Sequence, residues 1–143
     1  MTSHTMPRNR EVNLLPCVFC VALTARMAAC ELATTVVEGS GTACSSPLAR
    51  AACASLYGLL QERASFALKL RPGRPGPLAW SRALQVQCGG LLFLKETLDP
   101  QTQAPDIHRL VYLAQQHPGG ADELPAAPMI RRMTTWRNSS IER

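Results

Sequence analysis

The chain has 143 residues, of which 46% are hydrophobic, 17% charged and 5% aromatic, and its formal charge is +5. This length suits one compact domain, and the composition excludes a collagen, a long coiled coil and a charge-dominated disordered chain. Leu and Ala are abundant whereas Ile occurs only three times, which disfavours a β-sandwich and favours helix. We therefore predict an all-α fold, a small four-helix bundle-like domain with a mobile C-terminal tail.

The N-terminal part combines a basic start with an apolar run. Arg8 and Arg10 precede residues 12–25, which carry no charge, and this order is typical of a signal peptide or a membrane anchor. An acidic residue in the basic part, a proline in the apolar run and an arginine directly after it interrupt the pattern. We expect residues 1–12 to form a flexible segment. Cleavage or membrane embedding of residues 1 to about 29 remains the alternative.

Six cysteines occur in the chain, and Cys17 and Cys20 form a lone CxxC pair. A structural zinc site needs four ligands, commonly two such pairs or one pair with two closely spaced histidines. The sequence offers no such complement, so we predict no metal and no cofactor, and cysteines that act as small apolar residues of a buried helix. If the first 29 residues are removed, four cysteines remain, enough for two disulfides.

Four prolines open four apolar stretches, and proline is well tolerated at the first position of a helix. Short connections favour antiparallel neighbours within a helical domain of residues 13–118. The four helices are predicted over residues 16–37, 47–70, 77–98 and 105–116.

Caps and apolar spacing support the second and fourth of these helices. Ser46 precedes Pro47 and supplies an N-cap, and Asp106 adds negative charge to the first turn of the last helix. Gly89-Gly90 lies within the third helix and indicates a kink, a close helix crossing or a break. The apolar stripes expected to face the core are Leu48, Ala52, Leu56, Leu59 and Leu60 in the second helix and Ile107, Leu110, Val111 and Ala114 in the fourth.

The fourth helix ends at a His-Pro-Gly-Gly sequence, residues 117–120, after which the apolar period is lost. Residues 119–143 are predicted to form a flexible basic tail, in which residues 129–136 can form a short helix.

No nucleophile elbow, phosphate loop or dinucleotide fingerprint is present, so the leading hypothesis is a non-enzymatic protein. It is an adaptor or accessory protein that binds a protein partner, or a second copy of itself, through apolar helix faces. An intracellular location is favoured; the alternative is a secreted or membrane-associated protein that contacts the membrane through residues 12–25. The residues expected to contact the partner are Leu15, Phe19, Trp136 and Arg137.

A third hypothesis is a nucleic-acid-binding accessory protein. Thirteen of the 15 basic residues are Arg, all but Lys69 and Lys95, and the planar guanidinium binds phosphate well. Their scatter along the chain and a GC-rich coding bias weigh against this hypothesis. The Gly-Arg-Pro sequence around Arg74 is similar to the centre of an AT-hook-type arm and equally typical of a stiff linker. The candidate nucleic-acid contacts are Arg71, Arg74, Arg131 and Arg132.

Overall fold

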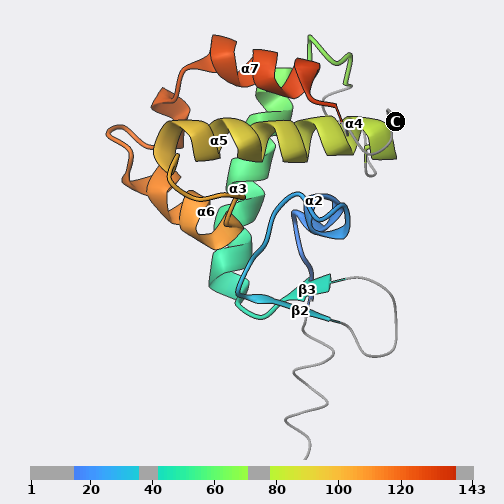
Figure 1. Ribbon diagram of the computed structural model, residues 1–143, viewed down its shortest axis with the longest axis vertical. Coiled ribbons are helices and arrows are strands. Elements are labelled where there is room, and N and C mark those ends of the chain that lie inside the picture. The colour runs from blue at the N-terminus through green and yellow to red at the C-terminus, as the bar shows by residue number, and fades with distance from the viewer. Residues whose placement is uncertain (1–14, 36–41, 71–77, 138–143) are drawn as a thin grey trace, which may run out of the picture.

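The computed structural model describes residues 15–35, 42–70 and 78–137, and this part of the chain is mainly helical (Figure 1). A small antiparallel sheet accompanies the helices. In chain order the elements are β1 (Leu15–Pro16), α2 (Cys20–Thr24), β2 (Ala33–Thr35), β3 (Thr42–Cys44), α3 (Pro47–Ala64), α4 (Trp80–Leu84), a π-helical turn (Gln85–Gly89), α5 (Gly90–Leu98), α6 (Ile107–Gln116), a 3₁₀ turn (Ala121–Glu123) and α7 (Ala126–Thr135). The mainly-α prediction is confirmed, whereas the four-helix bundle is not.

The first predicted helix, over residues 16–37, is wrong. Of residues 16–35, the part of this range that the structure describes, only the five residues of α2 are helical. β1 and β2 lie on either side of α2 and pair with β3 in a three-stranded sheet of order β1-β3-β2. The backbone turns to a φ of 62° at Arg26, just after α2, which is incompatible with a continuing right-handed helix. The β-branched Thr34 and Thr35 then suit a strand, with Thr34 opposite Ala43 of β3. The all-α prediction therefore fails in this region.

The second predicted helix is present as α3, but it ends at Ala64 rather than near residue 70. The Ser46 hydroxyl accepts a hydrogen bond from the Ala49 amide at 3.1 Å, which confirms the expected N-cap. Leu56 and Leu60 face the core as predicted. Leu48 does not, because 84% of it is exposed.

The third predicted helix is a continuous rod made of α4, the π-helical turn and α5 (Figure 1). Its two central glycines lie at close crossings with two other helices. A Cβ on Gly89 would lie 2.6 Å from the Met133 Cα of α7, and a Cβ on Gly90 would lie 2.7 Å from Leu60 Cδ1 of α3. Of the three readings that the sequence left open for this pair, the structure therefore shows the close crossing.

Gln87, in the π-helical turn, connects the rod to α2. It is a buried polar residue, only 2% exposed. Its Oε1 accepts a hydrogen bond from the Ala22 amide at 3.0 Å, and its Nε2 donates to the Val18 carbonyl at 3.1 Å. Burial raises the pKa of Tyr57 of α3, and a hydrogen bond with the Gln87 side chain opposes this shift. The amide is therefore satisfied at both ends, as a buried polar group must be.

The fourth predicted helix is present as α6, and its predicted apolar positions are buried. The Asp106 carboxylate accepts a hydrogen bond from the Arg109 amide at 3.3 Å and caps the helix. α6 packs against α3 and α5, so α3 lies between the sheet, α6 and the rod (Figure 1).

The predicted flexible tail of residues 119–143 is wrong for the residues up to 137, because α7 packs across the rod. Met129 and Met133 of α7 are fully buried, and Leu124 before it is 2% exposed. Arg63 of α3 donates to the Leu124 carbonyl at 2.6 Å and to the Asp122 carbonyl at 2.5 Å. The C-terminal segment is thus part of the core.

The close crossing at Gly89 predicts that substitution by alanine changes the stability of the fold in opposite directions at Gly89 and at Gly58. Gly89→Ala forces α7 away from the rod, since the new methyl group meets backbone atoms, and we expect it to lower the free energy of unfolding by about 1–3 kcal/mol. Gly58→Ala is the matched control. Gly58 lies exposed in α3 with nothing within 4 Å of a Cβ, so this change should raise stability by up to about 1 kcal/mol. Urea unfolding of both variants and the wild type measures the difference, and equal effects would contradict the crossing.

Candidate functional site

Two of the predicted partner-contact residues lie in the N-terminal region. Leu15, in β1, is 50% exposed, whereas Phe19 is fully buried and packs on the Tyr57 ring with centroids 5.5 Å apart. Phe19 is therefore a core residue rather than a surface contact. Of residues 12–25, proposed for membrane contact, those from 15 on include β1 and α2, and Ala22 of α2 is also fully buried.

The other two predicted contacts lie at the end of α7. Trp136 is half-buried and packs partly against the core. Arg137 is exposed, and its guanidinium donates to the Trp136 carbonyl at 2.8 Å. Trp136 and Arg137 are consecutive and directly follow α7, whereas Leu15 lies in β1.

The candidate nucleic-acid contacts divide into two groups. Arg71 and Arg74 lie outside the described residues. Arg131 is exposed on α7, whereas Arg132 pairs with the Glu96 carboxylate of α5 through both Nε, at 3.0 Å, and Nη2. The guanidinium of Arg132 thus holds α7 to the rod.

A groove lies between α3 and α6. Its volume is about 550 Å³, and it continues into a smaller hollow of about 120 Å³ nearer residue 122. Both hollows share Ala52, Ser55, Val111 and Gln115 as walls. The groove therefore follows the seam of the two helices.

Small residues form the α3 side of this groove and large apolar residues mark its rim. Ala49, Ala51 and Ala52 line it, while Leu48 is 84% and Tyr112 56% exposed. None of the residues that line the larger hollow is Asp, Glu, Lys or Arg. The larger hollow is thus a surface without carboxylate, lysine or arginine side chains on a chain that is otherwise rich in arginine, whereas the smaller hollow includes Asp122.

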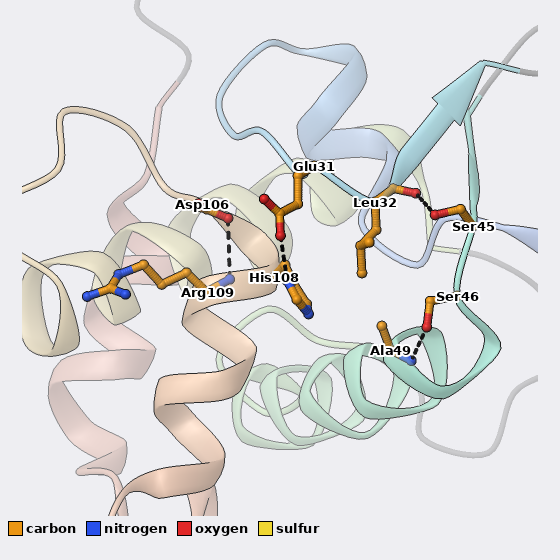
Figure 2. A network of polar contacts seen from close by, with 8 residues as sticks. All are labelled: Glu31, Leu32, Ser45, Ser46, Ala49, Asp106, His108 and Arg109. Atoms are coloured by element: carbon orange, nitrogen blue, oxygen red, sulfur yellow. Dashed lines mark hydrogen bonds and ion pairs between the residues drawn. The ribbon is translucent and has the colours of Figure 1, made fainter.

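One end of the groove is fixed by polar contacts from three segments (Figure 2). The Ser46 hydroxyl caps α3, and His108 of α6 faces Glu31, with Nδ1 and Oε2 3.3 Å apart. The Ser45 hydroxyl donates to the Leu32 carbonyl at 2.7 Å. These contacts set the start of α3 against the loop before β2 and the first turn of α6.

Sequence reasoning missed this groove because Leu48 was assigned to the buried stripe. The signal was present in the pattern of α3. Positions 51, 54, 55 and 58 are Ala, Ala, Ser and Gly, all exposed. They form a helix face without charged or large side chains, and two of them, Ala51 and Ser55, line the groove. An exposed helix face of a globular protein normally carries charged residues.

The comparisons with known proteins give no relative. No family model, no curated protein and no solved structure matches the chain. Within residues 15–35, 42–70 and 78–137, no helix is long and apolar enough to cross a membrane. In the same ranges no three His, Cys, Asp or Glu side chains are grouped so that they could hold a metal ion.

The pair of Glu96 and Arg132 predicts a pH-dependent contribution to stability. The hydrogen bond from Arg132 holds the pKa of Glu96 below its usual value of 4.5. A lowered folded-state pKa stabilises the fold above the unfolded-state pKa, and this contribution is lost as the pH falls through the folded-state pKa. Because both side chains are about half exposed, the pair contributes no more than about 1 kcal/mol.

We therefore expect Glu96→Gln to lower the free energy of unfolding slightly at pH 7. The difference in the free energy of unfolding between this variant and the wild type, here called the gap, should narrow as the pH falls below 4.5. Denaturant unfolding at a series of pH values measures the gap. Glu62→Gln, at an exposed position of α3, makes the same charge change on another helix and serves as control. A gap that stays constant down to strongly acidic pH would contradict the pairing.

Proposed function

We propose that the chain is a non-enzymatic interaction protein, an adaptor or regulatory subunit, that binds a helix of a protein partner in the groove between α3 and α6. The observation that supports this most is the exposure of Leu48 and Tyr112 on the rim of an uncharged hollow. Large apolar side chains next to a hollow are typical of interaction sites rather than of ordinary surface.

The shape of the groove favours a helix as the occupant. It runs along two helices, and its alanine floor permits the close approach of a third helix. Helix-in-groove recognition places apolar anchors at positions i, i+3, i+4 and i+7 into such a seam. Leu48 and Tyr112 then cover the anchors from both sides.

The chemistry of the groove selects the kind of helix. In the larger hollow, a charged anchor would lose its hydration against Ala49, Ala52 and Val111 with no Asp, Glu, Lys or Arg in the lining to pair with, which is unfavourable. Ser55 and Gln115 offer hydrogen-bonding groups along the same seam. The expected partner segment is an amphipathic helix with an uncharged apolar stripe, whose opposite face remains in solvent.

A phage-displayed library of amphipathic helices of about 14 residues, four turns long, tests this proposal. Helices selected on the wild-type chain should carry an uncharged apolar stripe. Leu48→Glu and Tyr112→Ala should weaken their binding about tenfold or more, because each removes an apolar contact at the rim.

Phe66→Ala is the matched control, since Phe66 is 95% exposed but does not line the groove, and it should bind the selected helices as the wild type does. All three positions are exposed, so circular dichroism and melting temperature should show intact folding. If no helix is enriched, or if Leu48→Glu leaves binding unchanged, the groove is not the binding site.

A further inference from the structure

Four of the six cysteines line one small, nearly closed space beside α3. They come from four different segments, and the remaining two cysteines, Cys20 and Cys88, do not line it. The free volume in this space is about 10 Å³, which is barely enough for one water molecule. The side chains themselves therefore fill the space. The four cysteines, here called the thiol cluster, are Cys17, Cys30, Cys44 and Cys53.

The strand register explains why two of these thiols meet. Leu15 pairs with Cys44 across the antiparallel strands, so their side chains point to the same face of the sheet. Cys17 lies two residues after Leu15, and its amide continues the ladder by donating to the Thr42 carbonyl at 2.9 Å. Because side chains alternate along a strand, Cys17 and Cys44 share one face.

The other two thiols reach this face from a loop and a helix. The Cys30 carbonyl accepts a hydrogen bond from the Ala33 amide at 3.2 Å, and Ala33 pairs directly with Cys44. Cys53 lies on α3, on the side that packs against β3. Sheet, loop and helix thus converge on the same space through their cysteines.

The four thiols differ in their exposure to solvent. Cys17 and Cys53 are buried, and burial raises the pKa of Cys17 and raises that of Cys53 to about 12. Cys30 and Cys44 are only partly buried. Because Cys30 and Cys44 are the more accessible thiols of the cluster, an external oxidant meets one of them first.

We propose that the thiol cluster is a disulfide-forming site, in which the four cysteines form two disulfide bonds when the chain meets a small-molecule disulfide such as oxidised glutathione. A protein thiolate attacks one sulfur of glutathione disulfide and releases glutathione thiolate. A second protein thiolate then attacks the protein sulfur of this mixed disulfide and releases the second glutathione. Formation of each protein disulfide oxidises two protein thiols, and their two hydrogens reduce one glutathione disulfide to two glutathione thiols.

The consequence for the fold does not depend on which thiols pair. The first three cysteines of the cluster all precede residue 45, whereas Cys53 is the only one of the four on α3. Any complete pairing therefore joins Cys53 to the segment of residues 15–44 and closes a second bond within that segment. Both bonds fasten the sheet region, which is otherwise held to α3 by contacts such as the 2.8 Å hydrogen bond from Arg50 Nε to the Pro16 carbonyl.

The test uses the full chain, purified in reduced form and incubated with oxidised glutathione. Remaining thiols are alkylated, and intact mass counts the disulfides. Digestion at Arg26, Glu31, Glu38 and Arg50 separates the four cluster cysteines into different peptides, so linked peptides identify the pairs. The expected result is two disulfides within the cluster, alkylated Cys20 and Cys88, and a melting temperature higher by on the order of 10 °C than that of the reduced chain.

Single-cysteine variants test which thiols form the two disulfides. Cys20→Ser removes the neighbouring thiol that shares a peptide with Cys17 and should still form both disulfides. Cys53→Ala should form no bond between α3 and the sheet region and should lose most of the gain in melting temperature. Should Cys53→Ala fail to fold, Cys44→Ser, at a partly exposed position, gives the same readout of one disulfide fewer. Four thiols that stay reduced, a bond to Cys20 or Cys88 in the wild type, or a stoichiometric zinc ion that blocks oxidation would each overturn the proposal.

Discussion

The close approach of three helices at two adjacent glycines is the constraint on which the rest of the fold depends. Gly89 admits the backbone of α7, and Gly90 admits the Leu60 side chain of α3. The rod of α4 and α5 therefore meets the α7 backbone directly on one side and contacts α3 through Leu60 on the other. Two residues before Gly89, the Gln87 side chain is hydrogen-bonded to the Ala22 amide of α2 and to the Val18 carbonyl just before that helix. A few residues of one π-helical turn thus position three other elements, and the large buried side chains, among them Leu91 and Met133, pack around them.

The sequence allows prediction of those elements whose signals are local. α3 has a serine cap before a proline and begins at Pro47 as expected. α6 has a capping aspartate and a clean apolar period, and it begins at Ile107, two residues after the predicted start. The close crossing was among the readings of Gly89-Gly90, because adjacent glycines in a helix leave room for another backbone. What the pair could not reveal is the identity of the neighbouring helices.

The elements that sequence reasoning missed depend on contacts between distant segments. The apolar run after Pro16 has no period that distinguishes a buried helix from a buried strand, and its strands form only by pairing with β3. α7 has too few apolar residues to be recognised from its sequence as a helix of the core. Its burial depends on the close contact of the Met133 backbone with Gly89. The groove was missed for the opposite reason, because Leu48 fits a helical stripe by spacing although the structure leaves it in solvent.

The groove and the space lined by the thiol cluster lie next to each other and share two lining residues. Ala49 of α3 and His108 of α6 line both, and a close-packed interior transmits displacement on one side of such residues to the other. Thermodynamic linkage then requires that whatever is coupled across it is coupled equally in both directions. If the proposed helix and the proposed disulfides favour different positions of Ala49, binding of the helix would change the reduction potential of the cluster. Oxidation of the cluster would then change the affinity for the helix by the same free energy.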